Sequence, residues 1–476
     1  MSTEAGPAGS SRRSRARARR TRGFLAAFAL VMAALIAVVV TGAALSLSQG
    51  PRLTSVQVDP AAAAAASGSR MILTANQALD SVTADQVSVE PDVPFTVDAS
   101  GRSVGVRFTV PLWDDTEYTV TVSDVEAVGG GPTADLTSSF RTPAAEVFLL
   151  QRSTSGDDAI FRTDLTGERA VPVFTHPHIE DFRASGDRLV VSVVEDDASV
   201  VLVTDLAGEN RRELRLPGDG IITALQVSGR GDLVGYTYSD RALDEDSGRE
   251  SVIFTQSLRQ ADAEPQPLEI AREAPSVVDW LFVPEATAAL LIDFAGDLLL
   301  TDPATDGDPT ALGAALTIDG ITVGTFQAVV ERIDGLRVLD LTDAGEEPLV
   351  PAEGEESLGV AGSVTPIPGG GTVRLYSERD AAGLPIEQSV VHVSDEGAVL
   401  PLLEVPISDG VLQTCVAPSG RYAAVLVAPD LVSNPYDGYL QPLPHNLETH
   451  IIELSTGDGV VTLAGSAISW CAVGAS

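Results

Sequence analysis

Between Glu146 and Cys471 the chain repeats one short pattern seven times. Each copy has a β-branched run, then an Asp, Ser or Gln, and then a turn that contains Gly or Asp. The clearest copies are residues 160–168 (IFRTDLTGE) and 201–209 (VLVTDLAGE), which are nearly identical from the Thr onward. A period of about 40 to 50 residues with several short strands per copy is typical of a β-propeller, whose four-stranded blades repeat around an axis. The pattern therefore predicts an all-β fold for this part of the chain.

Each repeat divides into four strands, a to d, of which a is innermost. The repeat after residue 178 shows this best, with strands at residues 179–184, 188–194, 199–204 and 212–216. The first repeat starts at strand b, because only an unrelated module precedes it, and residues 467–472 remain after the last repeat. Placed innermost in the first blade, this segment closes the ring and leaves no open sheet edge. We predict seven blades over residues 145–476, with an error range of six to eight.

The turns between strands a and b are short and rich in Gly. They include Ser185-Gly186-Asp187, Ser228-Gly229-Arg230-Gly231, Pro368-Gly369-Gly370-Gly371 and Ala417-Pro418-Ser419-Gly420. Glycine supplies the positive φ that a tight hairpin requires. These turns resemble the corresponding turn of TolB-type, WD-like propellers.

Before the repeats, residues 52–143 alternate apolar and polar positions over six or seven short runs. This pattern predicts an antiparallel sandwich. Val58-Asp59-Pro60, the block from Leu112 to Val122, and Ser139-Phe140-Arg141-Thr142-Pro143 resemble the bacterial Ig-like domain of the S-layer-protein type. The resemblance implies a spacer, and we expect Trp113 and Tyr118 to lie in its core.

The N-terminal region contains a segment that can cross a membrane. Phe24 to Ser46 holds 23 residues without a charge, which is long enough to span a bilayer as a helix. Seven Arg precede it, so the positive-inside rule places residues 1–23 in the cytoplasm as a tail. We favour an uncleaved anchor over residues 24–47, with the later domains extracellular. The alternatives are a cleavable signal peptide, because small residues follow at 41–44, and a twin-arginine signal at Arg19-Arg20.

The remainder of the chain is strongly acidic. The sequence has no Lys, and outside the N-terminal tail it carries 23 Arg against 66 Asp and Glu. This charge disfavours nucleic acid and anionic lipid as partners. High Ala, Val and Arg without Lys resembles the composition of actinobacterial proteins.

Cys415 and Cys471 are the two cysteines. Two cysteines in an exported chain suggest one disulfide. Cys415 falls in strand a of the seventh repeat and Cys471 at the matching point of the closing segment, so both approach the ring axis. We predict that they are bonded to each other; the alternative is two buried thiols too far apart to bridge.

Long insertions fall in the b–c and d–a loops, which emerge on one face of a propeller. They occupy residues 240–250, 378–388 and 430–448. Long loops of this kind are often functional. We predict a ligand-binding face here, with these candidate contacts: Tyr236, Tyr238, Asp240, Asn434, Tyr436, Asp437, Tyr439 and His445.

Acidic runs at Glu195-Asp196-Asp197 and Asp244-Glu245-Asp246 suggest Ca²⁺ as an alternative to a solvated surface. The second run lacks the alternation of an EF-hand loop, so we expect no metal and no cofactor. We also expect no metal at His176-Pro177-His178. The sequence has no G-x-S-x-G and no H-E-x-x-H motif.

These features favour a single-pass, monomeric binding protein that engages a protein or glycan of the cell envelope. The alternative is a propeller hydrolase or lyase acting on envelope glycan or peptide, with carboxylates among Asp240, Asp244 and Asp437 as acid or base. A third possibility is a purely structural surface protein.

Overall fold

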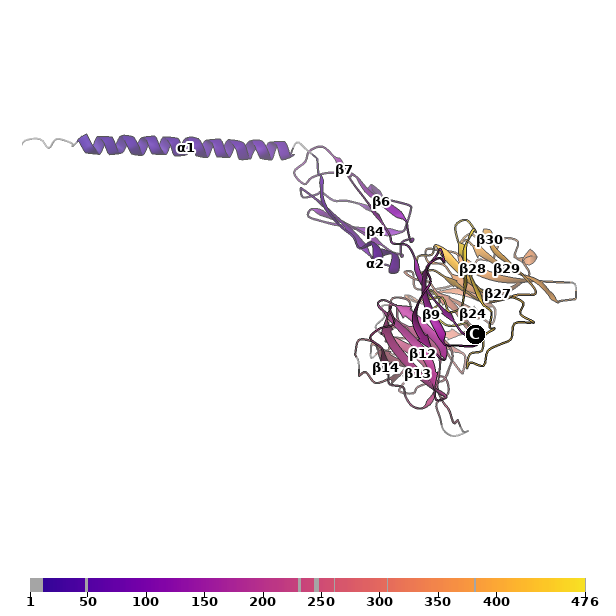
Figure 1. Cartoon of the computed structure of the whole chain (residues 1–476). Helices are drawn as coiled ribbons and strands as arrows, with labels where there is room; N and C mark the ends of the chain where they lie inside the picture. The colour runs from indigo at the N-terminus through magenta and orange to yellow at the C-terminus, as the bar shows by residue number, and fades with distance from the viewer. Residues whose placement is uncertain are drawn as a thin grey trace, which may run out of the picture.

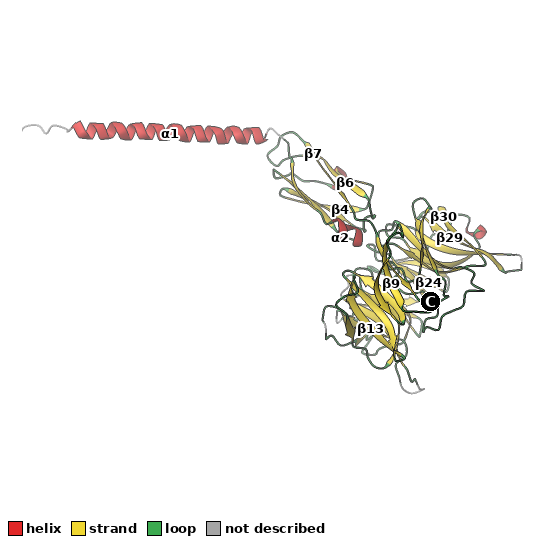
Figure 2. Cartoon of the chain, viewed as in Figure 1, coloured by secondary structure: helices red, strands yellow, loops and turns green. Residues whose placement is uncertain are grey.

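The computed structural model describes residues 12–47, 50–229, 233–243, 248–260, 262–305, 307–380 and 382–475. Helix α1 (Arg12–Leu47) begins the described chain and strands make up most of the rest, as Figure 2 shows. Within α1, Phe24–Gly42 is long and apolar enough to cross a membrane, and a signal sequence would have the same properties. A sandwich follows α1, and seven further sheets follow the sandwich (Figure 1).

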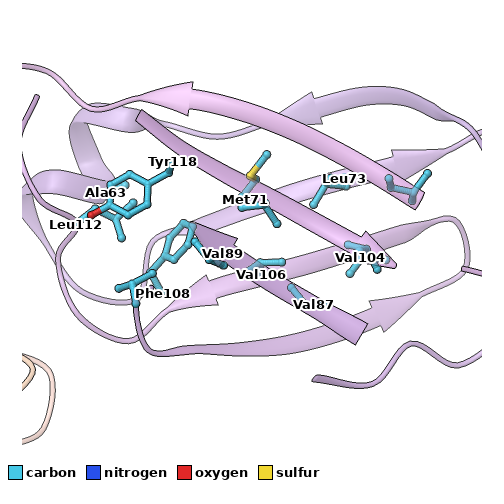
Figure 3. Close-up of a cluster of buried hydrophobic side chains, with 14 of the residues drawn as sticks. Ala63, Met71, Leu73, Val87, Val89, Val104, Val106, Phe108, Leu112 and Tyr118 are labelled. Atoms are coloured by element: carbon cyan, nitrogen blue, oxygen red, sulfur yellow. The ribbon is translucent and has the colours of Figure 1, made fainter. Parts of the chain in front are cut away.

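The sandwich has two antiparallel sheets. One has the order β1 (Leu53–Gln57), β2 (Arg70–Ala75), β5 (Ser103–Phe108), β4 (Phe95–Ser100); the other has β3 (Val87–Glu90), β6 (Glu117–Val125), β7 (Ala134–Arg141). Alternation along β6 from Glu117 to Val122 turns every second side chain, including Tyr118, into the space between the sheets, and a register shift follows before Val125. Figure 3 shows Met71, Leu73, Val106 and Phe108 in this core, with Tyr118 at one end of it beside Ala63 and Leu112.

The alanine run of the sandwich forms a short helix, α2 (Pro60–Ala65). A one-turn helix, η1 (Ala84–Gln86), lies elsewhere in the module. Asp59 caps α2, because its Oδ1 accepts hydrogen bonds from the backbone N–H groups of Ala61 and Ala62. Ala63 is fully buried against the sandwich core.

The seven later sheets are antiparallel and follow one another along the chain, which is consistent with propeller blades. We number them blades 1 to 7. Blade 1 contains β8 (Glu146–Gln151), β9 (Asp158–Asp164) and β10 (Val171–His176). Blades 2 to 4 contain β11 (Ile179–Ser185), β12 (Arg188–Glu195), β13 (Ala198–Asp205), β14 (Arg212–Leu214); β15 (Gly220–Val227), β16 (Leu233–Asp240), β17 (Val252–Ser257), β18 (Gln266–Pro267); and β19 (Val277–Phe282), β20 (Ala289–Asp293), β21 (Asp297–Thr301), β22 (Thr310–Ala314).

Blades 5 to 7 have the same layout. They contain β23 (Thr317–Ile321), β24 (Gln327–Arg332), β25 (Gly335–Asp340), β26 (Glu346–Pro348); β27 (Val360–Pro366), β28 (Thr372–Arg379), β29 (Pro385–Val393), β30 (Val399–Pro406); and β31 (Gly410–Val416), β32 (Tyr422–Ala428), β33 (Glu448–Glu453), β34 (Gly459–Ala464). A one-turn helix, η2 (Glu355–Ser357), lies between blades 5 and 6. We call the side of the b–c and d–a loops the upper face and the opposite side the lower face.

In blades 1 to 6 a side chain binds the backbone of the next blade, and in blade 7 a side chain binds Gly465, which joins β34 to the closing segment. In blades 1, 2, 3, 6 and 7 this side chain lies at or near the start of strand c, which is β9 in blade 1 and the third strand in the other four. The bonds are Ile179 N–H to Asp158 (2.7 Å), Ile222 N–H to Ser199 (3.2 Å), Ser251 Oγ–H to Val277 O (2.8 Å), Val411 N–H to Gln388 (3.0 Å) and Thr449 Oγ1–H to Gly465 O (2.8 Å). Blades 4 and 5 use inner-strand residues instead, with Ile318 N–H donating to Asp279 (2.9 Å) and Val364 N–H to Asp319 (3.1 Å).

The C-terminal segment closes the ring on blade 1. Ser466 exchanges two backbone hydrogen bonds of 2.9 Å with Leu150, and Ser469 N–H donates to Phe148 O at 3.0 Å. The predicted strand over residues 467–472 is nevertheless wrong: the pairing is an isolated bridge between Leu150 and Ser466, and residues 467–472 form no strand. Ala467 has a φ of 50°, which interrupts the extended backbone, and a turn follows it.

After this turn the chain crosses the ring axis. Arg183 of blade 2 donates to Ala472 O at 2.9 Å, and Gln413 of blade 7 donates to Val473 O at 3.0 Å. Val473 also packs against the apolar cluster of blades 4 and 5. Cys471 is bonded to Cys415, as predicted, with their Cα atoms 5.3 Å apart.

The sandwich is seated on the lower face. Ser67 hydrogen-bonds to Glu285 in the a–b turn of blade 4, and Asp114 accepts from Ser419 (3.0 Å) in the a–b turn of blade 7. Arg421 also binds the Asp114 carbonyl and donates to Thr116 Oγ1 at 3.2 Å. Burial raises the pKa of Asp114 above its ordinary value. The two modules are therefore in direct polar contact.

The prediction for Trp113 is wrong, whereas that for Tyr118 is confirmed. Trp113 is 36% exposed, and its ring lies 5.9 Å below the Arg421 guanidinium at the contact with blade 7. Its backbone N–H donates to the buried Tyr118 hydroxyl at 2.9 Å. The main chain of Trp113 thus ties it to the sandwich core while its side chain faces the next module.

We expect the change Cys415→Ser with Cys471→Ser to lower the free energy of unfolding by about 4 kcal/mol. The disulfide closes a loop with a sequence separation of 56, and removing it restores that loop's freedom to the unfolded chain. Chemical denaturation followed by near-ultraviolet circular dichroism measures the change. Reductant should lower the wild-type midpoint to that of the double variant and leave the variant unchanged. Equal midpoints for the oxidised wild type and the variant would contradict this.

Candidate functional site

The insertion of blade 7 folds across the upper face to blades 1 and 2. We call residues 430–447 the strap. Arg152, in the b–c loop of blade 1, is its main anchor: Nη1 donates to Asp437 Oδ2 (2.8 Å) and Gln441 O (2.9 Å). Nη2 donates to the backbone carbonyl of Glu180 in blade 2 at 2.7 Å. The Arg152, Asp437 and Glu180 side chains are 9%, 4% and 5% exposed, so this ion-pair cluster is nearly dry.

Tyr439 of the strap completes the anchor. Its ring lies 4.2 Å from the Arg152 guanidinium carbon, and its hydroxyl donates to Asp158 Oδ2 at 2.7 Å. The His178 ring packs against it with centroids 3.9 Å apart. Burial, together with the Asp158 carboxylate, raises the pKa of Tyr439. The strap residue Leu440 donates its N–H to Glu180 Oε1 at 2.9 Å.

Most of the strap residues predicted to bind a ligand are instead used to hold the strap. Asn434 is 3% exposed and bridges the two ends of the strap by bonding to Pro429 O (3.1 Å) and Asn446 O (2.8 Å). Tyr436 and His445 are exposed. His445 lines a hollow of about 300 Å³ that also borders Arg152. Of the predicted strap contacts, these two are the ones that a partner can reach without displacing the strap.

The predicted contacts in blade 3 are also engaged by other residues of the protein. Tyr236 and Tyr238 are fully buried in the core between blades. Asp240 forms a two-point ion pair with Arg249, with distances of 2.7 and 3.0 Å, across the base of the b–c loop. The hydrogen bonds from Arg249 lower the pKa of Asp240. Asp244 and its acidic neighbours at 245 and 246 lie outside the described residues.

The two histidines of blades 1 and 2 bind carboxylates separately. His176 Nε2 lies 3.2 Å from Glu195 Oε1, while His178 Nε2 contacts Glu180. Within the described ranges, no group of three or more His, Cys, Asp or Glu is arranged to hold a metal ion.

A cavity of about 240 Å³ lies on the ring axis between the inner strands of blades 4 to 7 and the C-terminal tail. Its lining includes Asp279 and Asp319, and burial raises the pKa of both. These two residues were not predicted from the sequence. The available signal was an Asp within the inner strand of repeats 4 and 5, which match the common pattern loosely.

A larger, shallower groove of about 1110 Å³ runs along the lower rim between blades 3 and 4. Gln256 lines it and donates its amide N–H to Ala263 O at 2.6 Å, while its Oε1 has no hydrogen-bond partner among the described residues. The described residues that line this groove include no aromatic side chain. It therefore lacks the flat apolar surface on which a sugar ring would stack.

No protein family and no curated protein matches the sequence. Among solved structures the chain is similar to β-propeller proteins. It matches the dihydro-heme d1 dehydrogenase NirN over 67% of this chain and 73% of the other, with 14% identity and a TM-score of 0.39. It matches a prolyl endopeptidase over 80% and 50%, with 11% identity and 0.47, and a chain of the mitotic checkpoint complex over 72% and 89%, with 10% and 0.37.

This chain thus spans half the length of the prolyl endopeptidase. With identities of 10–14% and TM-scores of 0.37–0.47, the activities of these proteins are not carried over to this chain. The blade assignment rests on the order and pairing of the sheets themselves.

We expect Arg152→Met to lower the free energy of unfolding by roughly 3–5 kcal/mol, because it leaves Asp437 and Glu180 buried without their cation. Hydrogen exchange should also rise across the strap. The matched control is Arg215→Met, which removes an exposed ion pair with Glu264 and should cost under about 1 kcal/mol. Equal effects of the two changes, measured by denaturation, would refute the anchoring role of Arg152.

We expect Asp279→Asn to stabilise the protein by about 1 kcal/mol at pH 8, since Asn still accepts the Ile318 N–H without a buried charge. The pKa of Asp279 is raised in the fold, so its contribution to stability is complete below the ordinary Asp pKa and is lost as pH rises through the folded value. The difference between variant and wild type should therefore grow from pH 4 to pH 8.

The exposed Asp297→Asn is the control for this titration and should show no such trend. Denaturant midpoints at each pH measure both variants. A difference between Asp279→Asn and wild type that is independent of pH would contradict the assignment.

Proposed function

We propose that this chain is a single-pass membrane protein that presents a seven-bladed β-propeller on an Ig-like spacer as an extracytoplasmic binding module. The observation that carries the proposal is the seat of the sandwich on the lower face. The upper face lies opposite the sandwich, and the sandwich lies between α1 and the blades (Figure 1). With α1 as an uncleaved anchor, the upper face is directed away from the membrane.

The disulfide supports an extracytoplasmic position for the ring, because disulfides persist in oxidising compartments. The Arg-rich tail supports a cytoplasmic N-terminus. We propose a protein or glycan of the cell envelope as the partner and a monomeric anchor as the acting form.

The state of the predicted acid and base residues favours binding over catalysis. Asp240 is paired with Arg249 and Asp437 with Arg152, so neither carboxylate is available to a substrate without breaking an ion pair. A general acid or base must reach the proton that it transfers.

An enzymatic function is the second candidate, and the axial cavity is the observation that favours it. Asp279 and Asp319 have raised pKa values and share that cavity, which is a pattern found at catalytic carboxylates. A hydrolase or lyase active on envelope glycan or peptide should lose its activity in Asp279→Asn and keep it in Asp297→Asn. Activity that survives Asp279→Asn would exclude this site.

The binding proposal is tested by photo-crosslinking of the full chain in its native membrane. The crosslinker p-benzoylphenylalanine replaces Val432 or Ile333, which are both 96% exposed on the upper face. Matched controls replace Val171 or Val460, which lie on the outer strands of blades 1 and 7. We expect discrete adducts from the upper-face positions alone. The absence of adducts, or the same adducts from all four positions, would overturn the proposal.

A further inference from the structure

The upper face of blades 4 and 5 exposes four large apolar side chains. Val278 is 63% exposed, Phe294 55%, Leu316 54% and Ile333 96%. We call these four residues the apolar patch. Exposed apolar groups that gather on one part of a surface commonly mark an interaction site.

The four side chains come from neighbouring segments of two successive blades on this face. Phe294 and Ile333 lie in the b–c turns of blades 4 and 5, while Val278 and Leu316 lie where the chain enters their inner strands. Phe294 N–H donates to Ser276 O at 3.1 Å, which joins the b–c turn of blade 4 to its own d–a connection. In the same way, Leu316 N–H donates to Glu331 O at 2.8 Å in blade 5.

The turns that carry the patch are well fixed. Asp293 Oδ1 accepts the backbone N–H groups of Ala295 (2.9 Å) and Asp297 (3.0 Å), which closes the turn beneath Phe294. Arg332 donates to Glu346 (2.7 Å) of its own blade and to Leu312 O (2.8 Å) in the outer strand of blade 4, which fixes the base of the Ile333 turn. An ordered apolar surface costs less entropy to bind than a mobile one.

The polar groups beside the patch are acidic. Asp297 and Glu331 are exposed and form no ion pair within the described part of the chain. The arginines of blade 5 do not offset them, because Arg332 is only 10% exposed and pairs with Glu346, while Arg337 pairs with Asp334. The patch therefore combines apolar contact area with uncompensated negative charge.

Resting on the proposed binding function, we propose that the apolar patch is the docking site for a cationic amphipathic segment of a partner protein in the cell envelope. Apolar side chains of that segment would cover Phe294 and Ile333, while its Lys or Arg residues would lie beside Asp297 and Glu331. A second copy of this chain fits poorly, because the sequence carries a net charge of −37 and the two acidic faces would repel. An anionic lipid surface is disfavoured for the same reason.

The test uses the full chain in zwitterionic lipid nanodiscs and a fluorescein-labelled 18-residue helical peptide built from Leu and Lys. Fluorescence anisotropy gives the dissociation constant, with empty nanodiscs as background. We expect the Leu and Lys peptide to bind, and a Leu and Glu peptide of the same length to bind at least tenfold more weakly. Raising the salt from 50 to 500 mM should weaken the binding of the cationic peptide several-fold.

The double variant Phe294→Ser/Ile333→Ser should bind the cationic peptide at least tenfold more weakly than the wild type does. Val432→Ser is the matched control, because it removes an equally exposed side chain of the strap on the same face, and it should leave affinity unchanged. Asp297→Asn/Glu331→Gln should reduce the salt dependence. All these substitutions lie at exposed positions, and circular dichroism verifies that each variant is folded.

Equal affinity of wild type and Phe294→Ser/Ile333→Ser, or equal binding of both peptides, would overturn the docking site. Concentration-dependent pairing of nanodisc-held chains that Ile333→Ser abolishes would overturn it in favour of self-association. These results differ from failure of the binding function itself. If crosslinked partners persist but the patch variants bind peptide normally, only this inference fails; if no partner is found at any upper-face position, the binding function fails.

Discussion

The ring depends on hydrogen bonds that side chains of one blade make to the backbone of the next. An inner strand has one edge paired within its own sheet, and its other edge faces the axis or the neighbouring blade, where backbone groups would be costly to leave unpaired. Asp158, Ser199, Ser251 and Gln388 satisfy such groups from nearly the same place in their blades. The apolar cores between blades supply the bulk of the stabilisation, and these polar contacts fix how successive sheets are set against each other.

This arrangement explains why much of the fold can be predicted from the sequence. The alternation along each strand and the Gly turns gave bounds in blade 2 within one or two residues of those observed, because both are local properties. The two repeats that match loosely are the ones in which Asp279 and Asp319 take over the contact from the third strand. Their divergence in sequence therefore has a structural reason.

The candidate site was less predictable, because it depends on contacts between distant parts of the chain. Asp437 looks like an available loop carboxylate until Arg152, far earlier in the sequence, is placed beside it. Tyr236 and Tyr238 lie on the same face of a strand whose two faces are both covered by neighbouring blades, so their alternation gave no indication of which face meets solvent. Trp113 was misplaced because the sequence of the sandwich alone does not show that another module covers it.

The closing contacts also determine the order in which the ring is completed. Blade 1 is made early and remains without its innermost partner until Ser466 and Ser469 arrive, and the covalent link to Cys415 needs a residue that follows them. As the chain is made, six sheets can form while the first still has an uncovered edge. Completion of the toroid is therefore postponed until Ser466 to Cys471 have been made, and throughout that interval the exposed edge of β8 is open to pairing with the wrong strand.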